Sequence, residues 1–176
     1  MNKQYISRAV ATAAATLLLA APLVVSAQTT APQMPTPDQA NSIKALTEQF
    51  FDDVHYTKLD AFNAITGPNF QVTLPDGSTL TADQVIGRAA ARNLEESGYL
   101  RSTSYGEMTT DGSTITEHVK DMDTADLIDG ERNLPAQTSS SQRTLTWMRD
   151  DSGNWVLVSE RIDSIDQSPY GSQYNS

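Results

Sequence analysis

The sequence predicts an α+β protein in which a curved antiparallel sheet packs on three N-terminal helices. Helical periodicity is confined to residues before about position 95, and from Tyr99 to about position 165 only strand patterns occur. In segment 143–163, two runs rich in β-branched and aromatic residues flank an Asp-Asp-Ser-Gly-Asn turn, which predicts a β-hairpin carrying both tryptophans. A sheet that curves around helices commonly leaves a pocket between the two layers.

The first 27 residues have the three parts of a secretory signal peptide. Lys3 and Arg8 give a positive start, residues 9–25 form an apolar run, and small residues end it at Ala27. We expect cleavage after Ala27 and a secreted or periplasmic protein with no stable membrane anchor. The chain contains no cysteine, so it forms no disulfide.

The rest of the chain predicts one domain with short flanking segments. Residues 28–36 are a flexible linker rich in Pro, Thr and Gln, residues 37–166 form the domain, and residues 167–176 are a polar tail. The net charge is −10, and it becomes −12 once the two cations of the signal peptide are removed. Such a charge disfavours nucleic acids and anionic membrane surfaces as partners.

Three helices are predicted before residue 95. Thr36, Pro37 and Gln39 form a capping box with proline at the first helical position, and the helix runs to about Tyr56. A shorter helix around residues 59–65 stops at Gly67-Pro68. The third begins with the Thr81–Gln84 capping box, and Gly98 is interpreted as the glycine that ends it.

The strand predictions follow from alternation and from turn residues. Residues 70–74 and 78–80 form a short hairpin around Pro75-Asp76-Gly77. Residues 99–109, 114–120, 124–129, 142–149 and 155–165 are the later strands, and residues 114–129 are either one bent strand or two. Residues 130–141 are interpreted as a polar loop.

Three segments carry a family resemblance. They are Leu59-Asp60-Ala61-Phe62, the stretch from Gly67 to Gly77, and the closing hairpin from Arg143 to Glu160. Together they resemble the nuclear transport factor 2-like, or SnoaL-like, superfamily of cone-shaped α+β domains, over residues 37–165. The resemblance implies a cone with an internal pocket, but little about activity, because the superfamily includes isomerases, dehydratases, hydrolases, carriers and assembly modules.

His118 and Asp121 are the weak catalytic candidates. The resemblance implies that enzymes of this type use an Asp, or an Asp and a His, inside the cone. Residues three apart in a continuous strand point to opposite faces, so these two cannot pair without a bulge. We therefore expect no acid–base dyad in the cavity and interpret His118 as a half-exposed strand residue.

Other polar groups give weaker signals. Asp52, His55 and Tyr56 share one helix surface, which we interpret as a solvated helix end because it offers too few ligands for a metal. The acidic residues from Asp121 to Glu131 are interpreted as a solvated edge, since their spacing fits no calcium loop. We expect no cofactor and no metal.

Apolar residues of the helices and strands are the candidates for the pocket wall. They are Phe50, Tyr99, Tyr105, Met122 and Trp147. Trp147 and Met148 are adjacent and must face opposite ways, so both faces of the sheet carry apolar residues. A homodimer through the outer sheet face is therefore expected, as is common in the superfamily that the chain resembles.

Three functions remain open from the sequence. The favoured one is an exported, non-catalytic domain that binds a small, partly apolar molecule or a protein. The second is a cone-fold isomerase or lyase with a buried carboxylate or histidine as general base, and the third is a dimeric assembly module. An Asp or His that faces the pocket, shielded from water and with a raised pKa, would favour the enzyme.

Overall fold

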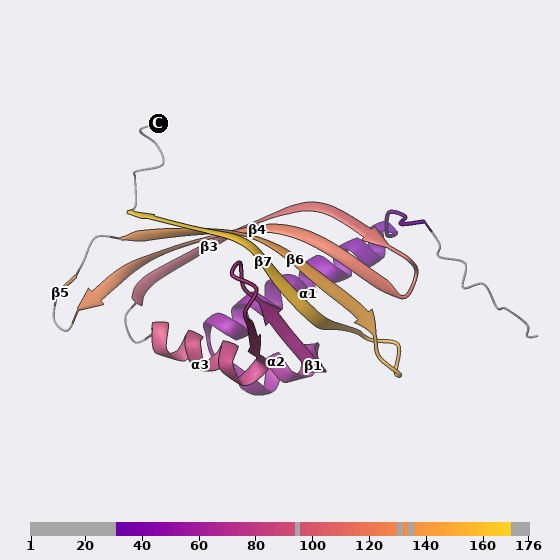
Figure 1. The fold of residues 1–176 in the computed structure, drawn as a ribbon, viewed down its shortest axis with the longest axis horizontal. Coiled ribbons are helices and arrows are strands. Elements are labelled where there is room, and N and C mark those ends of the chain that lie inside the picture. Colours follow the sequence, from indigo (N-terminus) through magenta and orange to yellow (C-terminus); the bar gives the residue numbers. More distant parts are fainter. Residues whose placement is uncertain (1–30, 94–95, 130–131, 134–135, 170–176) are drawn as a thin grey trace, which may run out of the picture.

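A computed structural model describes residues 31–93, 96–129, 132–133 and 136–169. The predicted signal peptide, most of the linker and the end of the tail lie outside the described residues. Three helices pack on one face of a long, curved sheet (Figure 1). The α+β class is thus confirmed.

The first helix, α1 (Pro37–His55), begins as the sequence predicts. Thr36 accepts a hydrogen bond from the Gln39 backbone at 3.3 Å, and the Gln39 side chain accepts one from the Thr36 backbone at 2.9 Å. The second helix, α2 (Leu59–Ile65), is short, and α3 (Ala82–Asn93) begins with the reciprocal bonds between Thr81 and Gln84. Both predicted capping boxes are confirmed.

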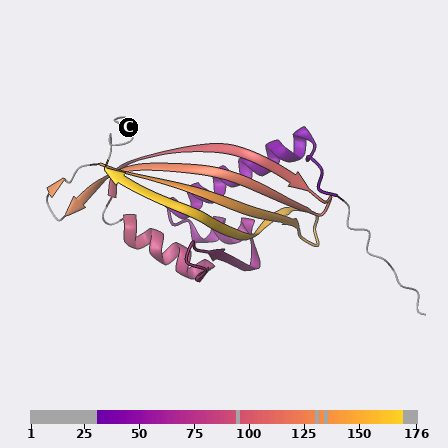
Figure 2. The same ribbon diagram turned by 45° about the horizontal axis from the view of Figure 1, so that its top comes forward.

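Seven strands form the sheet. They are β1 (Thr66–Thr73), β2 (Thr79–Thr81), β3 (Glu96–Thr110), β4 (Thr114–Asp129), β5 (Arg132–Asn133), β6 (Gln137–Arg149) and β7 (Trp155–Pro169). The order is β2-β1-β7-β6-β4-β3, with β5 beside β4. The strands β3, β4, β6 and β7 arch over the helices and extend past α3 (Figure 2).

The sheet differs from the prediction in three ways. It is mixed, because β7 returns beside β1 and runs parallel to it, whereas the remaining pairs are antiparallel. β6 begins at Gln137, within the segment expected to be a loop, because it pairs along the far half of β4; residues 114–129 form one strand, the first of the two alternatives left open. The expected polar tail likewise begins inside β7, which continues to Pro169.

Gly98 does not end α3. The helix ends at Asn93, and Gly98 lies in β3 with φ of +62°, next to a register shift between β3 and β4. This backbone conformation favours glycine. Gly98 thus marks a positive φ, as its residue type suggested, but the site is an irregularity of β3 and not the end of α3.

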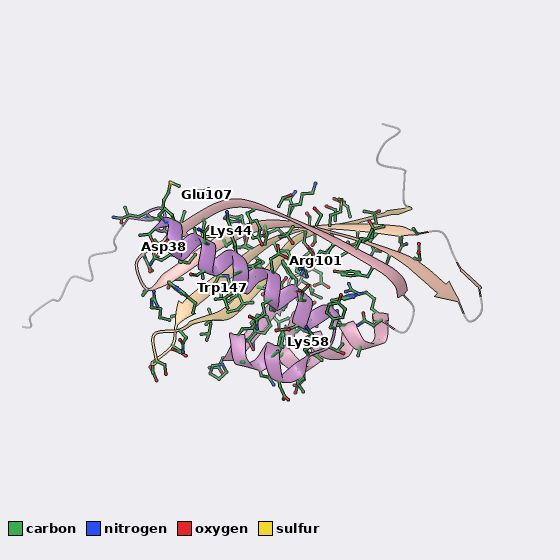
Figure 3. All side chains as sticks on the ribbon, turned by 180° about the vertical axis from the view of Figure 1, so that it is seen from behind. Asp38, Lys44, Lys58, Arg101, Glu107 and Trp147 are labelled. Carbon is green, nitrogen blue, oxygen red and sulfur yellow. The ribbon has the colours of Figure 1, made fainter. Side chains whose placement is uncertain are left out.

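The apolar core lies between the helices and the inner face of the sheet. Phe50, Phe62 and Phe70 form an aromatic cluster with ring centroids 5.6–5.8 Å apart. Trp147 from β6 is fully buried, and its neighbour Met148 is 42% exposed on the outer face. Trp147, labelled in Figure 3, belongs to the same buried cluster as Ile43 and Phe50 of α1. The expected division of this pair between the two faces is confirmed.

Candidate functional site

A cavity of about 260 Å³ lies between α1, α3 and the inner face of the sheet. Its wall has an apolar part, to which Phe50, Phe51, Val72, Leu80 and Ile162 belong. Its polar part comes mainly from the long strands and includes Tyr99, Asp121, Asp123, Arg143 and Glu160. An apolar wall with a small number of polar groups is typical of a small-molecule site.

The alternation of β4 determines which of its side chains reach the cavity. Glu117, Val119 and Asp121 are buried on the inner face, whereas His118 and Met122 are exposed on the outer face. The predicted separation of His118 from Asp121 is therefore confirmed. The sequence did not indicate which of the two faces inward, and it is the carboxylate.

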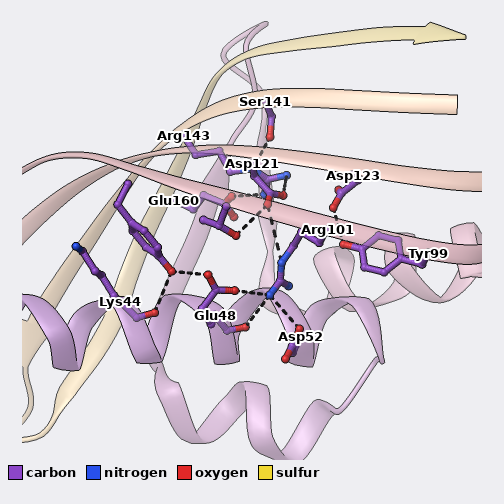
Figure 4. A network of polar contacts seen from close by, with 12 residues as sticks. Lys44, Glu48, Asp52, Tyr99, Arg101, Asp121, Asp123, Ser141, Arg143 and Glu160 are labelled. Atoms are coloured by element: carbon purple, nitrogen blue, oxygen red, sulfur yellow. Dashed lines mark hydrogen bonds and ion pairs between the residues drawn. The ribbon is translucent and has the colours of Figure 1, made fainter. Parts of the chain in front are cut away.

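Asp121 is shielded from water but incompletely paired. It is 2% exposed; Arg143 Nη2 lies 3.7 Å from Oδ2, and Arg101 Nε lies 4.0 Å from Oδ1 (Figure 4). The Thr103 hydroxyl donates a hydrogen bond to Oδ1 at 3.5 Å. Burial, with the neighbouring charge of Asp123, raises the pKa of Asp121 to about 6, although the two guanidinium groups oppose the rise.

The guanidinium of Arg143 is engaged mainly by other partners. Arg143 Nη1 donates to Glu160 at 2.6 Å, and Nε donates to the Ser141 hydroxyl at 2.7 Å. The same guanidinium lies 5.1 Å from the ring centroid of Phe51 in α1. Arg143 therefore neutralises Glu160 directly and Asp121 only at longer range.

Arg101 connects the polar wall to α1. Its Nη2 lies 2.6 Å from Glu48 and 3.0 Å from Asp52, and the Tyr105 hydroxyl donates to Glu48 at 2.5 Å (Figure 4). The Arg101 side chain is only 10% exposed. These contacts hold α1 against β3, which fixes one side of the cavity.

His55, at the end of α1, lies in the cavity wall rather than in solvent. It is 9% exposed and stacks on Tyr99 with ring centroids 3.5 Å apart, and the Tyr99 hydroxyl donates to Asp123 Oδ1 at 2.5 Å. Burial, followed by the charge of Arg92, lowers the pKa of His55, so the ring is neutral at pH 7. Its Nδ1 is buried without a hydrogen-bond partner. The expectation of a solvated helix end was wrong for His55.

The five predicted wall residues are divided between three places. Phe50 and Tyr99 line the cavity. Tyr105 packs against the core, and its hydroxyl donates a hydrogen bond to Glu48. Trp147 is fully buried within the core. Neither residue lines the cavity. Met122 lies on the outer face, as strand alternation dictates. His118 is also outside, where its Nδ1 lies 3.1 Å from the Thr144 hydroxyl.

Sequence reasoning missed most of the polar wall. Asp121 was weighed as a partner of His118 and, with Asp123, as part of a solvated acidic edge; the second interpretation was wrong for Asp121, which is buried. A usable signal existed: Glu117, Val119, Asp121 and Asp123 recur with a period of two, which places all of them on one face. No comparable signal marks His55, because its burial at the end of α1 depends on Tyr99, which comes from β3.

No helix in the described part of the chain is long and apolar enough to cross a membrane. Within the same ranges, no group of three or more acidic or histidine side chains is arranged to hold a metal ion.

Comparison with known proteins identifies the fold. No protein-family model and no curated protein matches the sequence. A conserved protein from Planctomyces limnophilus superposes with a TM-score of 0.64 at 7% identity, covering 74% of this chain and 98% of that one. A nuclear transport factor 2-like superfamily protein from Salmonella enterica gives 0.58 at 11% identity, covering 78% and 99%. The chain has the nuclear transport factor 2-like fold.

Several solved structures with this nuclear transport factor 2-like fold are of enzymes. The hexachlorocyclohexane dehydrochlorinase LinA-type3 from Novosphingobium barchaimii has a TM-score of 0.60 at 10% identity, covering 77% of this chain and 92% of that one. Identities this low establish a shared fold and leave activity to be argued from the cavity itself.

Proposed function

We propose that the protein is an exported domain that binds a small, partly apolar organic molecule in its cone cavity. The observation that carries the proposal is the two-sided wall: aromatic and aliphatic side chains on one part, and a buried polar cluster around Asp121 on the other. Apolar surface supplies binding free energy, and the few polar groups fix the orientation of the ligand.

The binding proposal is tested with a neutral probe and a blocked cavity. In an NMR titration, 2-phenylethanol should shift the signals of cavity residues. Ala89→Phe should abolish these shifts, because Ala89 lies buried in the wall on α3, whereas Ala90→Phe, on the exposed surface of the same helix, should not. Unchanged binding in Ala89→Phe would contradict the proposal; circular dichroism verifies that both variants fold.

A second candidate function is proton abstraction by Asp121, as in an isomerase or lyase. The observation that favours it is a buried, cavity-lining carboxylate with a pKa of about 6, since a general base works best when its pKa lies near the working pH. Arg143, the nearest cation to Asp121 within the wall, would stabilise negative charge developing on a substrate. The dehydrochlorinase with this fold makes an eliminating enzyme a reasonable comparison.

The catalytic candidate is tested by the Kemp elimination of 5-nitrobenzisoxazole. A base removes the ring C–H proton, the N–O bond breaks, and a coloured nitrophenolate forms. The rate should increase as the pH rises through about 6, because only ionised Asp121 accepts the proton. Asp121→Asn should remove this pH-dependent rate, and Asp126→Asn, exposed on the same strand, should retain it. Equal rates in wild type and Asp121→Asn would exclude Asp121 as the base.

The proposal places this activity outside the cytoplasm, because of the N-terminal pattern of residues 1–27. Intact-mass measurement of protein recovered from the periplasm or medium should give a chain that begins at Gln28. Recovery of a chain that retains Met1 would contradict export.

A further inference from the structure

Two carboxylates in the polar wall of the cavity accept few hydrogen bonds from the protein. Asp121 and Asp123 follow one another on the inner face of β4, and both line the cavity. Asp121 accepts one long hydrogen bond, from Thr103 at 3.5 Å, and Asp123 accepts one from Tyr99. A carboxylate can accept about four hydrogen bonds, so both retain free acceptor capacity.

His55 adds a second polar group of the wall with an unpaired atom. Its ring lies in the same wall, its side chain is nine-tenths buried, and Nδ1 has no partner. Buried polar atoms are nearly always hydrogen-bonded, so an unpaired one in a cavity wall indicates a group that a ligand completes. Because His55 is neutral, one of its ring nitrogens is an acceptor.

The charges of the buried wall are unbalanced in the same direction. Arg143 is held by Glu160 at 2.6 Å, and Arg101 is held on the α1 side by Glu48 and Asp52. Neither guanidinium is within 3.5 Å of Asp121. The inner wall therefore carries negative charge that the neighbouring side chains do not neutralise at hydrogen-bonding distance.

Two further cations face the cavity from α3. Arg88 and Arg92 contribute to the wall, but both are exposed, so water screens their charges far more than those of the buried carboxylates. They leave the sign of the charge in the buried wall unchanged.

We propose that the ligand of the cavity is an amine, whose ammonium group lies against Asp121 and Asp123 and whose apolar part lies on Phe50, Phe51 and Ile162. A primary ammonium supplies three donors and one positive charge, which complement the free acceptor sites of Asp121 and Asp123. The aromatic side chains attract a cation as well as apolar surface. This inference rests on the proposed binding function and specifies its ligand class.

The experiment compares three probes of similar size by isothermal titration of the purified full-length chain. They are 2-phenylethylamine, which is cationic, 2-phenylethanol, which is neutral, and 3-phenylpropanoate, which is anionic. The amine should bind at least tenfold more tightly than either of the others. Asp121→Asn and Asp123→Asn should each weaken amine binding about tenfold, and should lower the ratio of amine to alcohol affinity. Asp126→Asn makes the same charge change on the same strand, on an exposed side chain, and should change neither.

The outcomes separate this inference from the proposal on which it rests. If the alcohol binds as tightly as the amine, the cavity binds small molecules but does not select a cation, and the inference fails alone. If 3-phenylpropanoate binds most tightly and Arg88→Gln removes its binding, the sign of the ligand charge is the reverse of that proposed. If none of the three probes binds, the inference and the binding function both fail.

Discussion

The two tryptophans of the closing hairpin have different roles. The sequence favours Trp155 as the residue that anchors the last strand, because it directly follows the turn. In the structure Trp147 is fully buried in the core, whereas Trp155 is only half-buried and lies beside Arg149, 4.4 Å from its guanidinium carbon to the ring centroid. Strand alternation explains the difference, since Trp147 faces inward opposite Ile115 and Leu157.

Replacement of Trp147 should therefore destabilise the protein strongly. Trp147→Ala should lower the free energy of unfolding by about 3–5 kcal/mol, because it removes buried area and leaves a cavity. Trp155→Ala, at the half-buried position, should cost about 1 kcal/mol. Urea titrations of the two variants provide the comparison, and a larger loss for Trp155→Ala would reverse this assignment.

Asp121 should make stability depend on pH. Its pKa is raised from 3.8 to about 6 in the folded state, so the folded protein binds more protons between these values. The contribution of Asp121 to stability therefore falls as the pH rises through this window, and the total loss at pH 7 is of the order of 2–3 kcal/mol. Asp121→Asn cannot ionise and should gain stability relative to wild type from pH 4 to pH 7 in urea unfolding. If the difference in unfolding free energy between Asp121→Asn and wild type were the same at every pH, the raised pKa of Asp121 would be contradicted. Asp126→Asn, at an exposed position, is the control.

The alternation of side chains along a strand predicted which residues lie on opposite faces of the sheet, but not which of the two faces is covered by the helices. It separated His118 from Asp121 and Trp147 from Met148, because neighbouring positions on a strand alternate. Which side faces the helices depends on register between β4, β6 and β7, which local patterns do not specify. His55 was beyond prediction for a related reason, because only tertiary contacts bury the last turn of α1.

At the scale of elements, local signals predicted beginnings better than ends. The capping boxes at Thr36 and Thr81 are formed by residues three apart, so the sequence contains the whole interaction. The start of β6 and the parallel pairing of β1 with β7 depend on partners far along the chain. The polar Gln-Thr-Ser-Ser-Ser run of β6 therefore resembled a loop, although pairing on both sides makes it a strand.

Gly98 offers a test of the irregular pairing between β3 and β4. A Cβ added here would lie 2.7 Å from Asp126 Oδ2, and φ is +62°. Gly98→Ala should cost about 1–3 kcal/mol, from backbone strain and the displaced carboxylate. Gly77→Ala is the matched control. Gly77 has φ of +82° with open space around it, so this variant should lose stability through backbone strain alone. Equal losses for the two variants would show that the contact with Asp126 costs nothing.

At the scale of the whole molecule, helices cover the inner face of the sheet, and within the described ranges no helix covers the apolar residues of its outer face. Leu100 is 70% exposed, Met122 36% and Met148 42% on this outer face. We propose that a second copy of the chain covers these residues, in a homodimer through the outer face of the sheet. Exposed apolar side chains on a sheet face are a common basis for such contacts.

Charge on the outer face should separate the two copies. Leu100→Glu combined with Met122→Glu should convert a dimer to a monomer in light-scattering measurements, because two carboxylates from each copy would be brought together. Met34→Glu is the control, since Met34 is 87% exposed and lies outside the sheet. A wild-type protein that remains monomeric at high micromolar concentration would refute the dimer.

Because the side chains of β4 alternate between the two faces of the sheet, the register of this strand decides which of them face the cavity. One face of this strand carries Glu117, Val119 and Asp121, and the other carries His118, Lys120 and Met122. A single residue inserted before position 117, with the pairing of residues 114–116 retained, would shift the residues that follow by one and exchange the two sets. Lys120 would then take the place of Asp121 in the cavity wall, and Met122 would take the place of Asp123. An insertion of one residue can thus give the same fold a preference for ligands of the opposite charge, with every original side chain retained.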